Sequence, residues 1–302
     1  MSQQPVSLSG DESPRTGVVA WLGLFVRGMA KGVAELVPGV SGGTIAFVTG
    51  IYTELVRSLA GFRFRSLALL KSDGPIGFWR HNNLSFLFVL GLGMVASVLL
   101  FARLFHHLLL TVPTVVWGFF FGLIAASAVH IGRQLPWRNL VSAGSLGVLA
   151  GLMLLAVGPG DAEPATWAYF FGGMAAISAW LLPAVSGSFL LLALGLYEGV
   201  LEALSQGHMI VLLMLGGGCL IGLLLFSRLL SWLMHAYREP VLALLTGFMA
   251  GSLVRLWPWR HEGELFSPQG FEVAAGQPAL LVGVVLAIAS GTVALWLLSR
   301  LE

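Results

Sequence analysis

The 302-residue sequence has few charged residues and almost no cysteine. Asp, Glu, Lys and Arg make up 10% of the chain, against about 25% in an average soluble domain. Hydrophobic residues make up 57%, and the mean hydropathy is +0.89. This composition excludes a water-soluble globular domain, a disordered chain and a nucleic-acid-binding protein. The single cysteine, Cys219, excludes an internal disulfide and therefore a disulfide-stabilised secreted scaffold.

The apolar residues are gathered in long runs, and a bilayer-spanning helix needs about 17–25 such residues. The runs with this property are 84–105, 113–132, 139–157, 209–231, 240–256 and 279–299. Polar stretches separate them, and we expect loops at 61–83 and 257–278. Residues 1–16 are polar, show no cleavable signal and are expected to form a tail. The pattern predicts an all-α polytopic membrane protein.

Two further apolar regions, 17–60 and 165–204, are interrupted in the middle. The interruptions are Pro-Gly-Val-Ser-Gly-Gly at 38–43 and Pro-Ala-Val-Ser-Gly-Ser at 183–188. Proline removes a backbone donor, and glycine accepts dihedral angles that other residues avoid. Each region is therefore predicted to form two half-helices joined at a break, as a hairpin that is re-entrant or fully spanning.

The chain contains an internal repeat. A shift of 145 residues aligns 28–59 with 173–204, with 12 identities in 32 positions, among them both Pro-x-Val-Ser-Gly segments. A shift of 125 residues aligns Phe-x-Arg-Leu at 101–104 with the same pattern at 226–229. The sequence therefore predicts a tandem duplication, with the first repeat at 17–160 and the second at 165–302.

The topology follows from parity and charge. Each repeat has one hairpin that returns to its starting side and three plain spans, so the second repeat must be inverted. On this scheme eleven basic residues lie on one face: Arg15, Arg57, Arg63, Arg65, Lys71, Arg80, Arg133, Arg138, Arg228, Arg238 and Arg300. The opposite face has only Arg103, Arg255 and Arg260. The positive-inside rule then predicts that both termini are cytoplasmic.

The two breaks are candidate anion sites. A helix that begins inside the membrane presents unpaired N–H groups and the positive end of its dipole. Paired broken helices in inverted repeats also mark the binding sites of many transporters. The residues where the second half-helices are expected to begin are Ser41, Gly42, Gly43, Thr44, Ser186, Gly187 and Ser188. The alternative is that these small residues serve only close helix packing.

Arg27, Lys31 and Glu35 precede the first break at a spacing that puts them on one helical stripe. We expect Arg27 and Lys31 to meet a phosphate-sized anion, with Glu35 holding one of them or carrying a proton. The alternative is an interfacial helix with its basic side toward lipid headgroups. The second repeat has Ala176 and Trp180 in place of Lys31 and Glu35, which predicts an asymmetric site.

Arg103 and Arg228 occupy equivalent positions, one predicted near each membrane face, and are candidates to pass an anion between two gates. The alternative is that both are snorkelling anchors. An enzyme is not expected, because a nucleophilic serine is needed once and this serine is duplicated. The sequence has no zinc-protease signature or Walker loop, so no metal or cofactor is expected.

The first motif, Glu-Leu-Val-Pro-Gly-Val-Ser-Gly-Gly-Thr at 35–44 with Gly-Ile-Tyr-Thr-Glu-Leu at 50–55, resembles the opening signature of the PopT family of bacterial inner-membrane polyprenyl-phosphate transporters. Pro-Ala-Val-Ser-Gly-Ser-Phe at 183–189 resembles the family's second motif, with Phe189 at a threonine-like position. The resemblance implies movement of undecaprenyl phosphate from the outer to the cytoplasmic leaflet, for reuse in peptidoglycan and envelope synthesis. It also implies a site open laterally to the lipid.

Two other classes of function fit the same sequence. An ion-coupled secondary transporter of a soluble small anion would use the same hairpins without a lateral opening. A structural or assembly membrane protein would use the motifs only for packing. Because no nucleotide-binding segment is evident, any driving energy is expected from an Na⁺ or H⁺ gradient or from consumption of the product.

Overall fold

The computed structural model describes residues 17–37, 40–62, 72, 74–153, 164–183 and 185–299, and most of them are helical. The first half contains α1 (Val18–Glu35), α2 (Gly42–Val48), α3 (Tyr52–Ala60), α5 (Gly74–His81), α6 (Leu84–Thr111), α7 (Pro113–Gly132), α8 (Trp137–Asn139), the π-helical turn η1 (Leu140–Gly144) and α9 (Ser145–Met153). The second half contains α10 (Ala168–Leu181), α11 (Gly187–Ala193), α12 (Tyr197–Gln206), α13 (Met209–Ala236), α14 (Arg238–Ser252), β1 (Arg260–His261), β2 (Glu264–Leu265), α15 (Pro268–Ala275) and α16 (Leu281–Leu298).

Within the described residues, α6, α7, α13 and α16 are long and apolar enough to cross a bilayer. The pair α11 and α12 passes the same criteria together but bends by 106° at its break. The predicted spans 139–157 and 240–256 are helical over 140–153 and 238–252, respectively. The prediction of a helical polytopic membrane protein is therefore confirmed.

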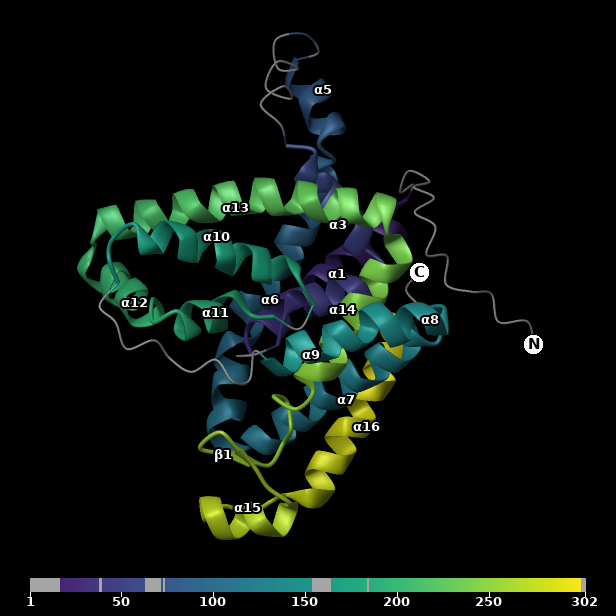
Figure 1. Ribbon diagram of the computed structural model, residues 1–302, viewed down its shortest axis with the longest axis vertical. Coiled ribbons are helices and arrows are strands. Elements are labelled where there is room, and N and C mark those ends of the chain that lie inside the picture. The colour runs from purple at the N-terminus through teal and green to yellow at the C-terminus, as the bar shows by residue number, and fades with distance from the viewer. Residues whose placement is uncertain are drawn as a thin grey trace.

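The predicted loops at 61–83 and 257–278 were wrong in part, because both contain regular structure. Helix α5 lies in the first, and the second holds an antiparallel pair of two-residue strands followed by α15. Glu262 and Gly263, at φ 49° and 88°, form the tight turn between the strands. Ser267 caps α15 by accepting from the Gly270 N–H at 3.1 Å. In Figure 1, α5 and α15 lie at opposite ends of the molecule.

The two halves repeat the same helix packing. Helix α1 packs along α6, and α10 packs along α13. A Cβ on Gly93 would collide with the Phe25 carbonyl oxygen, and a Cβ on Gly218 would collide with that of Phe170. These pairs are related by the same shifts of 145 and 125 residues that align the sequence repeats. The closest contacts of α1 with α6 and of α10 with α13 therefore follow the shifts of the predicted repeat.

The third helix of each half packs on the other half. Helix α16 lies along α7, while η1 and α9 lie along α14 (Figure 1). Both contacts are close, because a Cβ on Gly291 would collide with the Phe119 carbonyl and one on Gly147 with the Leu244 carbonyl. The halves are therefore interlocked, and the breaks of both hairpins lie between them.

This packing predicts opposite effects for two neighbouring glycines. Gly93→Ala should destabilise the protein by about 1–3 kcal/mol, since its methyl group has no room against α1. Gly91→Ala is the matched control, because nothing lies within 4 Å of its Cβ position. It should be neutral or stabilising by up to about 1 kcal/mol through helix propensity. Thermal unfolding in detergent measures both; equal effects would contradict the packing.

Candidate functional site

Both second half-helices begin where the sequence predicts. Helix α2 starts at Gly42 with Ser41 as its N-cap, and α11 starts at Gly187 with Ser186 as its N-cap. Ser41 Oγ accepts a hydrogen bond from the Gly43 N–H at 3.1 Å, and Ser186 Oγ accepts one from the Phe189 N–H at 3.5 Å. The breaks are therefore two capped helix starts.

Each half-helix ends at a glycine with positive φ. Gly50 follows α2 at φ 73°, and Gly195 follows α11 at φ 70°. Side chains with a Cβ rarely adopt this conformation, so glycine allows the sharp turn into α3 and α12. The two residues are also aligned by the repeat. The hairpins therefore share their turn geometry as well as their caps.

The two hairpins contact each other at their breaks. Ser41 Oγ donates to the Leu182 carbonyl oxygen at 3.0 Å. A Cβ on Gly43 would lie 2.8 Å from that same oxygen, so a side chain there would push the hairpins apart. Lys31 Nζ lies 3.9 Å from the centre of the Trp180 ring. The predicted asymmetry is visible here, because Lys31 packs against the tryptophan that replaces Glu35 in the second repeat.

A partly buried ion pair lies at the start of α2. The Lys31 side chain is fully buried, and its Nζ donates to Glu35 Oε1 at 3.2 Å. The Gly42 N–H donates to the same oxygen at 3.2 Å. The protein's own carboxylate therefore takes the place predicted for an anionic ligand. Arg27, one turn earlier in α1, is also buried, with 8% of its surface exposed.

The remaining predicted residues are dispersed. Ser186 Oγ and Ser188 Oγ lie 2.8 Å apart at the start of α11. Thr44 is fully buried in α2. Arg228 Nη2 donates to the Phe62 carbonyl oxygen at 2.6 Å and ties α13 to the end of α3, whereas Arg103 is exposed on α6.

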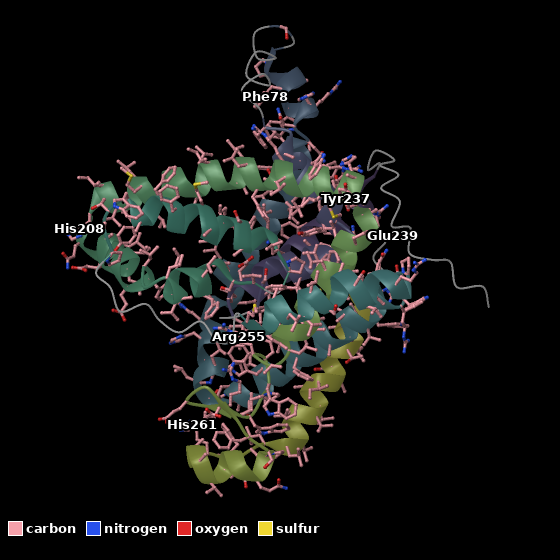
Figure 2. All side chains as sticks on the ribbon, viewed as in Figure 1. Phe78, His208, Tyr237, Glu239, Arg255 and His261 are labelled. Carbon is pink, nitrogen blue, oxygen red and sulfur yellow. The ribbon has the colours of Figure 1, made fainter. Side chains whose placement is uncertain are left out.

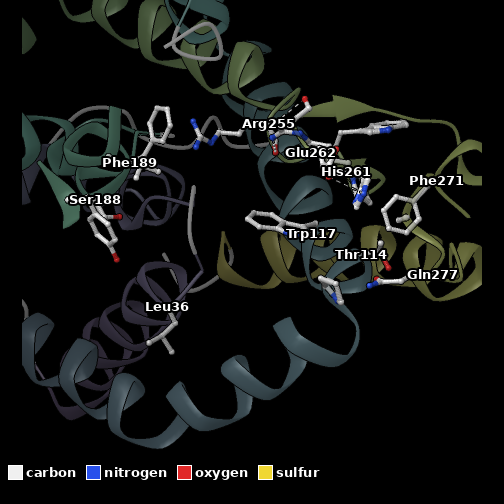
Figure 3. A pocket seen from close by; sticks show the side chains of 18 of the residues that line it. Leu36, Thr114, Trp117, Ser188, Phe189, Arg255, His261, Glu262, Phe271 and Gln277 are labelled. Carbon is white, nitrogen blue, oxygen red and sulfur yellow. Dashed lines mark hydrogen bonds and ion pairs between the residues drawn. The ribbon is translucent and has the colours of Figure 1, made fainter. Parts of the chain in front are cut away.

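A cavity of about 670 Å³ opens between the two halves (Figure 3). Helices α1 and α7 line it from the first half, and α11, the start of α12 and the segment 255–277 line it from the second. Only Glu35 and Ser188 of the predicted site residues border it. The cavity is therefore next to the hairpin breaks but is built largely from residues that the sequence reasoning left out of the site.

Two arginines give the cavity its chemistry. The Arg255 guanidinium stacks on the Phe189 ring at 3.3 Å (Figure 3). Arg260 donates from Nη1 to the Arg255 carbonyl oxygen at 2.7 Å. In the part of the chain that the structure describes, neither arginine is paired with a carboxylate. Partial burial lowers the pKa of Arg260, yet an arginine stays protonated at neutral pH.

The carboxylates that border the cavity do not neutralise the positive charges of the two arginines. Glu35 is paired with Lys31, and Glu262 faces solvent, with 87% of its side chain exposed. A phosphate group entering the cavity would meet two guanidinium groups held by aromatic and backbone contacts. This arrangement suits an anion with several acceptor oxygens.

The signal for Arg255 and Arg260 was present in the sequence. They are two of the three basic residues predicted on the otherwise cation-poor face, and they flank Trp257 and Trp259. The indole N–H groups donate to the Phe266 and Ala279 carbonyl oxygens at 2.9 and 2.8 Å, respectively. In the sequence these arginines served only to orient the chain, and their place at the cavity was not predicted.

Residues 31–272 match the VCA0040-like family, described as undecaprenyl phosphate translocase-like. The chain belongs to this family. The family match covers the second hairpin, the first hairpin from Lys31 onward with the Lys31–Glu35 pair, and both cavity arginines. The family resemblance inferred from the first motif is thus confirmed.

Two relatives of the chain are named polyprenyl-phosphate transporter. The protein from Vibrio cholerae serotype O1 is 39% identical over 290 residues, which cover 89% of this chain and 94% of the relative. The protein from Staphylococcus aureus is 32% identical over 260 residues, which cover 79% and 86%, respectively. No solved structure matches the chain.

Proposed function

We propose that this protein carries a polyprenyl phosphate, of the undecaprenyl phosphate class, from the outer to the cytoplasmic leaflet. The cavity beside Arg255 and Arg260 receives the phosphate headgroup. The observation that carries the proposal is the pair of adjacent guanidinium groups, neither neutralised by a carboxylate among the described residues, in a cavity between the halves. The family and the names of the two relatives support the ligand class.

The headgroup chemistry fits this cavity. A monoester phosphate carries close to two negative charges and three acceptor oxygens. Arginine presents planar forked donors that match phosphate oxygens, and two arginines match the charge of the dianion. The Ser188 hydroxyl borders the same space and adds a hydrogen-bond donor. The prediction of a phosphate site near the second break is retained in this form.

The lipid tail needs an apolar route out of the cavity. Leu36, Trp117 and Leu192 border the cavity, and Leu192 is 39% exposed. An isoprenoid chain can therefore leave along α11 into the surrounding lipid while the phosphate stays inside. A carrier of a soluble anion has no need for such a route.

We propose that the residues of the first break hold the two hairpins together next to the headgroup cavity. Lys31, Glu35, Ser41 and Gly43 join the first hairpin to Trp180 and Leu182 of the second. Glu35 also borders the cavity, so the headgroup site and the hairpin contact share one carboxylate. Coupling of this carboxylate to an Na⁺ or H⁺ gradient stays a prediction.

Membrane orientation completes the proposal: the halves are inverted, both termini are cytoplasmic, and the cavity opens to the outer face of the inner membrane. The distribution of basic residues along the sequence supports this orientation. In Figure 2, Phe78 lies at the top of the view, Tyr237 and Glu239 at the right, His208 at the left and His261 at the lower left.

Thermal stabilisation by a panel of ligands tests the function. Long-chain polyprenyl monophosphate should raise the unfolding temperature of the detergent-purified protein, because a ligand at 100 times its Kd adds about 2.7 kcal/mol. The matching diphosphate and free polyprenol should stabilise less. Stabilisation by inorganic phosphate equal to that by the lipid would replace this proposal with transport of a soluble anion.

A further inference from the structure

A second pair of arginines repeats the cavity pair. Arg255 and Arg260 stand in Arg-Leu-Trp-Pro-Trp-Arg, directly after α14. Arg133 and Arg138 stand in Arg-Gln-Leu-Pro-Trp-Arg, directly after α7. Four of the six positions are identical at a shift of 122 residues, and α7 and α14 are equivalent helices of the two repeats. The arginine pair is therefore part of the duplicated unit.

The two copies are in different environments. In the second repeat, Trp259 is 5% exposed and packs with Phe271 of α15. In the first repeat, the equivalent Trp137 is 71% exposed, and Arg133 and Arg138 are also exposed. One copy of the motif therefore borders an open cavity, while the other lies on the surface.

The counterparts of the cavity lining explain the difference. The repeat shifts relate the cavity-lining residues Leu36, Trp117, Leu192, Tyr197 and Trp257 to Leu181, Leu242, Phe47, Tyr52 and Leu135, respectively. All five counterparts are buried in one hydrophobic cluster and are at most 8% exposed. In the first repeat, side chains therefore fill the space that is equivalent to the cavity. Their counterparts in the other repeat line the open cavity.

One of these counterparts carries a polar group without a partner. Tyr52 is 2% exposed, and its hydroxyl makes no hydrogen bond in the described structure. Its repeat counterpart, Tyr197, borders the open cavity. A buried hydroxyl without a partner costs about 1–3 kcal/mol in this conformation.

We propose that the first repeat contains a second phosphate site, formed by Arg133, Arg138 and Tyr52, that is closed in this structure. It opens toward the cytoplasm when the cavity beside Arg255 and Arg260 closes, as the two repeats exchange conformations. Its ligand is the phosphate monoester of the same polyprenyl lipid, so this inference rests on the proposed function. Together the two sites receive the headgroup on one face and release it on the other.

The test separates binding at the open cavity from transport. The double variant Arg133→Lys/Arg138→Lys keeps both charges, and so preserves the positive-inside pattern, but lacks the forked donors. In proteoliposomes it should move a fluorescent polyprenyl monophosphate at least about tenfold more slowly than wild type. Thermal stabilisation by the same lipid, which reports on the open cavity, should be unchanged. Arg80→Lys, on the exposed surface of α5, is the matched control.

Tyr52→Phe gives a second readout that a structural role would not produce. Removing a hydroxyl without a partner should leave the unfolding temperature equal or higher, yet transport should fall several-fold. Transport at the wild-type rate in both Tyr52→Phe and the double lysine variant would overturn the second site. Failure of wild type to be stabilised by the lipid would instead overturn the proposed function itself.

Discussion

Replacing Arg255 or Arg260 with glutamine is expected to weaken polyprenyl-phosphate binding by at least about 30-fold, because truncating one partner of a buried charge pair costs about 2–5 kcal/mol. Both guanidinium groups border the cavity, and no carboxylate among the described residues is paired with either. Ligand-dependent thermal stabilisation measures the loss. Neither variant should lose its fold, because neither arginine closes an ion pair within the described structure.

Arg103→Gln is the matched comparison for this experiment. Arg103 is predicted on the same membrane face as the cavity arginines, but it is exposed on α6 and does not border the cavity. The sequence pattern by itself makes it a ligand candidate, whereas the cavity geometry predicts binding within about twofold of wild type. Equal losses in all three variants would indicate a general effect of surface charge instead of a headgroup site.

Breaking the Lys31–Glu35 pair is expected to produce the largest loss of stability. Lys31→Met leaves the Glu35 carboxylate, 27% exposed, without its cation, and removing one partner of a largely buried pair costs up to about 3–5 kcal/mol. The unfolding temperature in detergent should fall by roughly 10 °C. Glu35→Gln should have a comparable effect, because it leaves a fully buried ammonium group beside the Trp180 ring with no carboxylate partner among the described residues.

The double variant Lys31→Met/Glu35→Gln provides the control. Glutamine can still accept the Gly42 N–H, and methionine can still fill the space beside Trp180, so most of the lost stability should return. Additive losses would show that the two side chains act independently. Sequence reasoning expected Lys31 to meet a ligand, and the structure instead shows it fully buried and paired.

Most of the fold could be predicted from the sequence because the strongest signals in it are local. Apolar runs, the two Pro-x-Val-Ser-Gly breaks and the repeat shifts were sufficient to predict where α2 and α11 begin and that the chain is a helical membrane protein. These signals could not show which helices of one half pack against which helices of the other half. The contacts of α16 with α7 and of α9 with α14 depend on small residues that are common throughout membrane helices.

The candidate site was less accessible from the sequence, for a physical reason. Charge spacing places Arg27, Lys31 and Glu35 on one stripe, but it does not show that Glu35 neutralises Lys31 and accepts the Gly42 N–H. Arg255 and Arg260 lie in a short segment with a two-residue turn and a capped helix, which was read as a loop. The place of Arg255 beside Phe189 depends on a contact between distant segments.

The most direct test of the central claim is an experimental structure of the full chain in a lipid nanodisc with a long-chain polyprenyl monophosphate. The account predicts phosphate density in the cavity, within about 2.7–3.1 Å of guanidinium nitrogens of both Arg255 and Arg260, and a tail that leaves past Leu192. Phosphate density at the start of α2, with the Lys31–Glu35 pair broken, would contradict it.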